Sequence, residues 1–148
     1  MVSILIVAHA PLATALQAIA GHTYAECSGE VVAVDVQSAG GLPTAEAQIA
    51  VALAAMPATE VLILTDVFGA TPCTAALNVA DGVRSRVVAG VNVPMLWRSL
   101  CYAHLPLVEL VERAADGGRR GIMPDTSPLC QEQPKRPPSH GSDQDPDQ

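Results

Sequence analysis

Four short runs of Val, Ile, Leu and Ala, each followed within a few residues by a proline, organise the sequence up to Pro94. The runs are residues 2–8, 31–36, 61–65 and 86–89, and the prolines are Pro11, Pro43, Pro72 and Pro94. A continuous apolar run of this kind is typical of a strand buried on both faces. Proline fits the first turn of a helix, where its missing N–H costs nothing. The pattern therefore predicts four strand–helix units in a parallel sheet, with all four strand-to-helix loops along one edge.

Local signals predict where the helices begin and end. Thr71 precedes Pro72 and is expected to be the N-cap of the third helix, and Asn92 or Val93 is expected to cap the fourth. Gly21 is expected to stop the first helix. A further helix is expected to start at Pro106 and to end at Gly117-Gly118.

Taken together, these elements predict an α/β fold with three layers: a flavodoxin-like parallel sheet of four strands with helices on both faces. Residues 121–123 are a candidate for one more short, antiparallel strand. With 148 residues the chain is expected to form one domain, spanning residues 1–123. Residues 124–148 hold six of the 12 prolines and few apolar residues, so this tail is expected to be disordered.

Composition and charge exclude several classes of protein. The net charge of −7 argues against a nucleic-acid-binding protein, which needs a basic face. The four cysteines show neither zinc-ligand nor disulfide-framework spacing. The apolar N-terminal run lacks a preceding Lys or Arg and is interrupted by His9 and Pro11, which disfavours a signal peptide. The sequence has no run of about 20 apolar residues, which is the length that a membrane-spanning helix needs. A cytoplasmic location is expected.

Two polar residues stand where strands are expected to end. His9 closes the first run and Asp66 follows the third. Each has an ordinary interpretation, since a lone histidine is more often structural and an aspartate often caps a turn. However, ligands of open parallel sheets bind beyond the carboxyl ends of the strands, and neighbouring strands would bring both residues there. We expect Asp66 to orient the His9 ring, so that one imidazole nitrogen is free to act as a nucleophile.

The segment Phe68-Gly69-Ala70-Thr71 precedes the third helix and is a candidate site for an anion. Small residues let backbone N–H groups approach a ligand, and the helix N-terminus adds partial positive charge. Nucleotide-binding, metal-ligand and nucleophile-elbow motifs are missing from the sequence. No cofactor is therefore expected. Trp97 is either a packing residue or part of a partner surface.

Three motifs in order carry a resemblance to a known family. They are the strand ending in His9, the stretch from Asp66 to Pro72, and residues 88–96. Together they resemble the mannose-family enzyme IIA (EIIA) domain of the bacterial phosphotransferase system. The resemblance covers residues 1 to about 123.

The resemblance implies a phosphotransferase component. His9 matches the phosphorylated histidine, which accepts a phosphoryl group from the carrier HPr and passes it to a IIB-type acceptor. Asp66 matches the orienting aspartate, and Phe68, Gly69, Ala70 and Thr71 match the loop beside the phosphoryl group. The resemblance also implies a homodimer in which residues 121–123 form the strand exchanged between subunits. Contact with a membrane would occur only through transporter partners.

Two alternatives remain open at this point. The chain is either a carrier in sugar uptake or a regulatory phospho-acceptor of a phosphorelay without sugar transport. A third, non-catalytic interpretation is a flavodoxin-like binding module whose crevice holds a small anion.

Overall fold

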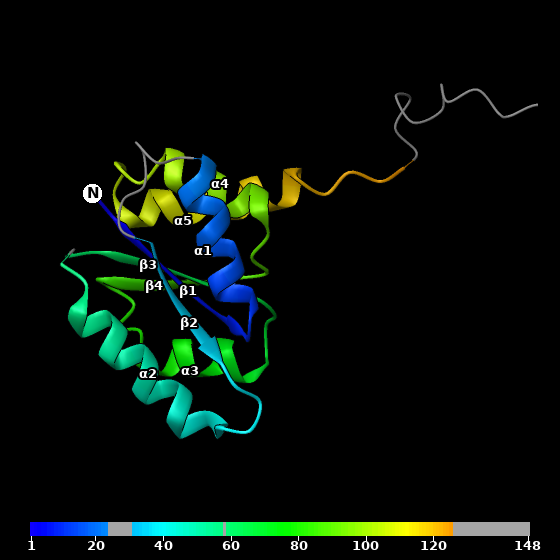
Figure 1. Cartoon of the computed structure of the whole chain (residues 1–148). Helices are drawn as coiled ribbons and strands as arrows, with labels where there is room; N and C mark the ends of the chain where they lie inside the picture. Colours follow the sequence, from blue (N-terminus) through cyan, green and yellow to red (C-terminus); the bar gives the residue numbers. More distant parts are fainter. Residues whose placement is uncertain (24–30, 58, 126–148) are drawn as a thin grey trace, which may run out of the picture.

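A four-stranded parallel sheet forms the centre of the fold, with strand order β2-β1-β3-β4 (Figure 1). The computed structural model describes residues 1–23, 31–57 and 59–125. The strands are β1 (Ser3–His9), β2 (Val31–Val36), β3 (Val61–Thr65) and β4 (Ser85–Ala89). The helices are α1 (Leu12–Thr23), α2 (Gly41–Ala55), α3 (Thr71–Val79), α4 (Val93–Cys101) and α5 (Leu107–Arg120).

Side chains of β1 alternate between two separate apolar cores. Ile4 and Ile6 face a core shared with α1, α4 and α5, whereas Leu5 and Val7 face a core shared with α2 and α3. Figure 1 shows these two helical layers on opposite faces of the sheet. The predicted three-layer, flavodoxin-like architecture is thereby confirmed.

The predicted helix stops at glycines are wrong. α1 continues past Gly21 to Thr23, because a glycine weakens a helix by only about 1 kcal/mol, which packing can offset. α5 continues through Gly117 and Gly118 to Arg120. A Cβ built on Gly117 would lie 2.6 Å from Cβ of Arg98, so this glycine lets α5 pack closely against α4.

The short strand expected at residues 121–123 does not form within the described chain, and its exchange between two subunits stays a prediction. These residues pair with no described strand, and Ile122 and Met123 have 71% and 73% of their surface exposed. The predicted tail from residue 126 onward lies outside the described residues.

Across the described ranges, no helix combines the length and the apolar character needed to cross a bilayer. Cys73 is buried and Cys101 exposed, and both are free thiols. Cys27 and Cys130 lie outside the described residues.

Candidate functional site

His9 and Asp66 lie together at the carboxyl edge of the sheet. β1 and β3 are neighbours in parallel register, with Val7 opposite Thr65, so the residues that follow in each strand come side by side. Nδ1 of His9 lies 2.6 Å from Oδ2 of Asp66. The contact predicted between the two side chains is therefore present.

Two backbone donors also hold the Asp66 carboxylate. The His9 N–H donates to Oδ2 at 2.9 Å, and the Val67 N–H donates to Oδ1 at 2.8 Å. The ring and the backbone of His9 thus bind the same carboxylate oxygen. This double anchorage fixes both the position and the plane of the imidazole, and no sequence signal revealed the backbone contact.

The electrostatics of the site favour a charged carboxylate. Burial of Asp66 acts to raise its pKa, but the hydrogen bonds from the His9 backbone, the His9 ring and Val67 outweigh it, and the pKa lies below its ordinary value. A carboxylate that stays ionised accepts the hydrogen bond from Nδ1–H and assigns the proton of a neutral ring to that nitrogen.

The two side chains differ in exposure. The His9 side chain has 44% of its surface exposed, against 12% for that of Asp66. With Nδ1 bound to Asp66, Nε2 is the ring nitrogen left to meet an incoming group. The arrangement is that of a nucleophile facing solvent and an orienting group behind it.

The start of α3 differs from the prediction in one residue. Ala70, not Thr71, is the N-cap; its backbone is extended, and Thr71 is already the first helical residue. The turn before it needs Gly69, whose φ of +88° lies in the left-handed region. Phe68 is 78% exposed. An alanine cap supplies no side-chain acceptor and Pro72 has no N–H, so the Thr71 N–H is the first donor that this helix end offers to an external anion.

The helices α1 and α4, in contrast, start with a side-chain acceptor. Asp35 on β2 accepts hydrogen bonds from the backbone N–H and the hydroxyl of Thr14 in α1. Asn92 accepts from the Met95 N–H and donates to the Gly118 carbonyl, which also ties α4 to α5. The cap of α4 was predicted as Asn92 or Val93 and is Asn92, whereas Asp35 was missed because its partner lies 21 residues away in sequence.

No group of three or more His, Cys, Asp or Glu side chains within the described part of the chain is placed to hold a metal ion. His22 and His104 lie in other parts of the chain than the His9–Asp66 pair. His22 lies in the last turn of α1, and the centre of the His104 ring lies 6.2 Å from that of the Tyr102 ring.

Comparison with known proteins identifies the family to which this chain belongs. A family model described as "PTS system fructose IIA component" (EIIA-man) matches residues 3–114. The chain belongs to this EIIA family of the phosphotransferase system (PTS). It is 34% identical over 114 residues to the PTS system fructose-specific EIIA component of Bacillus subtilis (strain 168), covering 75% of this chain and 77% of that relative.

Solved structures agree in fold. The mannose/sorbose specific IIA subunit of the phosphotransferase system from Enterococcus faecalis superposes with a TM-score of 0.75 at 24% identity, covering 83% of this chain and 93% of that one. Phosphotransferase system component EIIA from Streptococcus agalactiae gives 0.72 at 20% identity, with coverage of 84% and 97%. Membership in the EIIA family implies a phosphocarrier role in the phosphotransferase system, with HPr and IIB components as the general class of partner.

Proposed function

We propose that this EIIA chain carries a phosphoryl group on Nε2 of His9, accepts it from an HPr-type phosphocarrier and passes it to a IIB-type acceptor. The 2.6 Å contact between Nδ1 of His9 and Oδ2 of Asp66 carries the proposal, because it leaves the other ring nitrogen as the nucleophile. The exposure of the ring supports access by a protein partner.

Each transfer exchanges one N–P bond for another. The Nε2 lone pair of neutral His9 attacks phosphorus in line, the N–P bond of the donor phosphohistidine breaks, and its electron pair returns to the donor ring. Phospho-His9 then carries positive charge in its ring, which the Asp66 carboxylate stabilises through Nδ1–H. The donor is already a phosphoramidate, so the step needs no nucleotide.

The segment Phe68-Gly69-Ala70-Thr71 is proposed to hold the phosphoryl oxygens. The Thr71 N–H and hydroxyl stand at the start of α3, and the Ala70 cap leaves them without a competing side-chain acceptor from that position. Phosphoryl transfer relies on positioning and on charge stabilisation, which donors at a helix N-terminus provide. Phe68 contributes exposed apolar surface next to the nucleophile, where a partner would dock.

Mass spectrometry tests the assignment directly. After incubation with enzyme I, HPr and phosphoenolpyruvate, the chain should gain the mass of one phosphoryl group in acid-labile form. His9→Gln should gain none, whereas His104→Gln, which removes a histidine distant from Asp66, should behave like the unchanged chain. Normal labelling of His9→Gln would rule the proposal out.

The acceptor decides between sugar uptake and regulation. Phosphorylated chain mixed with IIB-type proteins should lose its label to one of them if it serves transport. A regulatory phospho-acceptor would keep the label until it meets its target.

We also propose a homodimer that works in the cytoplasm and meets the membrane only through transporter partners. The outer edge of β4 ends the described sheet, and Ile122 and Met123 are exposed apolar residues just past α5, which suits pairing between subunits. Sedimentation should give twice the chain mass, and Ile122→Asp should shift it to the monomer.

A further inference from the structure

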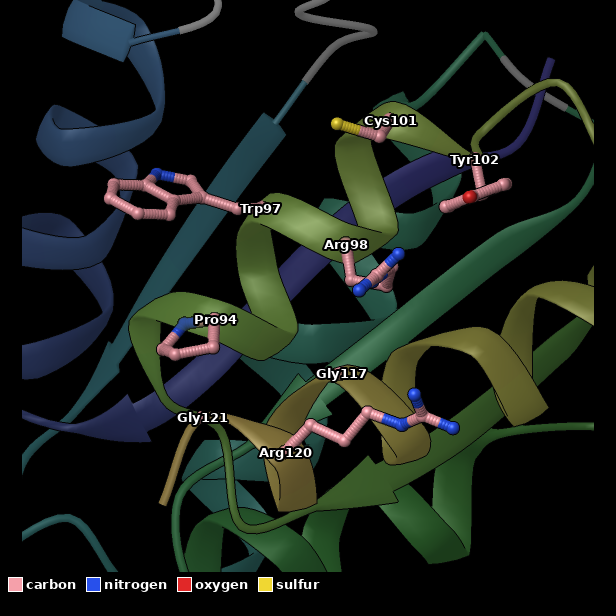
Figure 2. A pocket seen from close by; sticks show the side chains of 8 residues that line it. All are labelled: Pro94, Trp97, Arg98, Cys101, Tyr102, Gly117, Arg120 and Gly121. Atoms are coloured by element: carbon pink, nitrogen blue, oxygen red, sulfur yellow. The ribbon is translucent and has the colours of Figure 1, made fainter. Parts of the chain in front are cut away.

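A pocket of about 670 Å³ lies between α4 and α5. Figure 2 shows its eight lining residues, with Trp97 extending to one side of α4, toward α1, and Arg98 and Arg120 on the other side. This volume is within the range of pockets for small organic ligands. Neither His9 nor Asp66 lines it.

The charge of this pocket is opposite to that of the whole chain. The chain has a net charge of −7, yet none of the eight lining residues is acidic and two are arginines. Residues 1–83 contain no Lys or Arg at all, whereas α4 and α5 together contribute Arg98, Arg113, Arg119 and Arg120. α5 also carries Glu109, Glu112 and Asp116, so the excess of positive charge belongs to the pocket lining and not to the two helices as a whole.

The two guanidinium groups at the pocket have different surroundings. Arg98 lies over the Tyr102 ring at 5.6 Å, and Arg113 approaches the same ring at 5.3 Å. Arg120 pairs through Nε with Asp116 at 2.9 Å, while its side chain remains 75% exposed. Within the described chain neither Arg98 nor Arg113 forms an ion pair with a carboxylate. Of the two pocket arginines, Arg120 thus has a carboxylate partner and Arg98 has none among the described residues.

Glycines bring these arginines into one pocket. A Cβ on Gly117 would lie 2.6 Å from Cβ of Arg98, and a Cβ on Gly121 would lie 2.3 Å from Cγ of Pro94. Side chains at either position would push α5 away from α4 and separate Arg98 from Arg120. Gly117, one of the two glycines expected to end the helix, therefore shapes the pocket together with Gly121.

We propose that this pocket binds a small organic phosphate that carries a flat ring, a chemistry represented by nucleotides. The guanidiniums of Arg98 and Arg120 match phosphate oxygens, because arginine presents planar, charge-assisted donors. Trp97 offers an aromatic face for the ring of the ligand. A ligand site next to the start of α4 adds to the phosphocarrier role and does not depend on it.

Trp97 is the only tryptophan of the chain and lines this pocket, so its fluorescence is a probe of binding there. Titration of the full chain with ADP, without metal ions and with adenine absorbance corrected, should change the Trp97 emission in a saturable manner. Adenosine carries the flat ring without the phosphates, and inorganic pyrophosphate carries the phosphates without the ring. Both should therefore bind more weakly than ADP. Calorimetry should report the same dissociation constant as fluorescence.

Variants separate the pocket from its surroundings. Arg98→Gln and Arg120→Gln should each weaken ADP binding about tenfold or more, as expected for loss of a hydrogen bond from a charged group. Arg119→Gln removes a neighbouring charge outside the pocket lining and should bind ADP as the unchanged chain does. His9→Gln should also retain binding, which keeps this test independent of the phosphocarrier assignment.

Three results would overturn the proposal. ADP could leave both the fluorescence and the calorimetric signal unchanged. Both arginine variants, shown to be folded by circular dichroism, could bind as tightly as the unchanged chain. Pyrophosphate could match ADP in affinity, which would remove the flat ring from the ligand class.

Discussion

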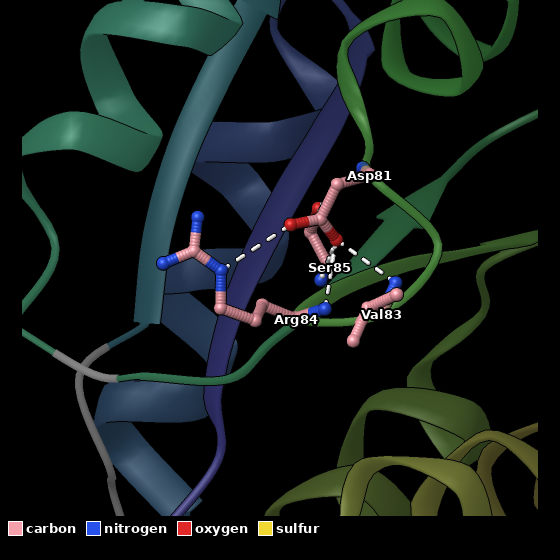
Figure 3. Close-up of polar contacts among 4 residues, drawn as sticks. All are labelled: Asp81, Val83, Arg84 and Ser85. Carbon is pink, nitrogen blue, oxygen red and sulfur yellow. Dashed lines mark hydrogen bonds and ion pairs between the residues drawn. The ribbon is translucent and has the colours of Figure 1, made fainter.

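Asp66 and Asp81 are two carboxylates built in similar ways at opposite edges of the same sheet. Asp66 follows β3 at the carboxyl edge, and Asp81 lies between α3 and β4 at the amino edge. Each accepts backbone N–H groups: Asp66 from His9 and Val67, and Asp81 from Val83, Arg84 and Ser85 (Figure 3).

Both carboxyl groups have a lowered pKa, but the relative size of the causes differs between them. At Asp81 the backbone hydrogen bonds from Ser85 and Val83 are the largest influences, and burial, which opposes them, comes after both. At Asp66 burial is the largest influence and acts in the opposite direction, so the His9 and Val67 hydrogen bonds must overcome it. Asp66 is enclosed beside an exposed histidine, whereas Asp81 faces solvent.

The difference separates a site from a turn. The Asp81 carboxylate binds its own loop, with every partner within four residues. The Asp66 carboxylate binds a residue 57 positions away that can act as a nucleophile. A lowered pKa alone therefore does not mark a functional site in this protein; the proposed site rests on the contact between the Asp66 carboxylate and a distant histidine.

The largest expected effect comes from Asp66→Asn. An asparagine amide can donate to Nδ1, which would move the ring proton to Nε2 and block the nucleophile. We expect phosphoryl transfer from phospho-HPr to fall about 100-fold, a loss typical of a misplaced reacting group. The initial rate of label uptake measures it.

Asp81→Asn is the matched control for that experiment. It removes a carboxylate with comparable backbone contacts from the other edge of the sheet, so transfer should be unchanged while the thermal unfolding midpoint falls. An equal loss of transfer in both variants would break the distinction between the two carboxylates.

Gly117 and Gly21 can also be compared, because a Cβ at each position would meet different surroundings. Gly117→Ala should destabilise the fold by about 1–3 kcal/mol, because its Cβ would clash with Arg98 and the core would be overpacked. Urea unfolding gives this value. No loss of stability would show that α4 and α5 can separate without cost.

Acid should reveal the Asp66 contacts as a change in stability. The folded pKa of Asp66 is lowered, so its contribution is complete above the unfolded value of about 3.9 and declines as pH falls through the folded pKa. The difference in unfolding free energy between the unchanged chain and Asp66→Asn should therefore shrink below about pH 4. A difference that stayed constant from neutral to acidic pH would contradict the lowered pKa.

Gly21→Ala should have the smallest effect, and of opposite sign to Gly117→Ala. A Cβ at Gly21 would meet nothing within 4 Å, so the variant should gain about 0.5–1 kcal/mol from helix propensity. Destabilisation by this change in urea unfolding would mean that α1 does not continue past Gly21.

Much of this arrangement was predictable from local patterns. Apolar runs and prolines specify the strands, their direction and the loops at one edge. This pattern is enough to predict that His9 lies near Asp66. What remained hidden depends on contacts between distant segments. The His9 backbone contact, the Asp35 hydrogen bonds to Thr14 and the packing of Gly117 on Arg98 all require the folded register. The Ala70 cap was missed because Thr71 is the better cap by propensity, while the turn at Gly69 starts the helix one residue earlier than a Thr71 cap requires.

The position of the phosphoryl group within the imidazole tests the central claim most directly. Nitrogen-resolved NMR of the phosphorylated chain should place phosphorus on Nε2 of His9, with Nδ1 still protonated and bonded to Asp66. Phosphorus on Nδ1, or on any other residue, would contradict the claim that Asp66 selects the reacting nitrogen.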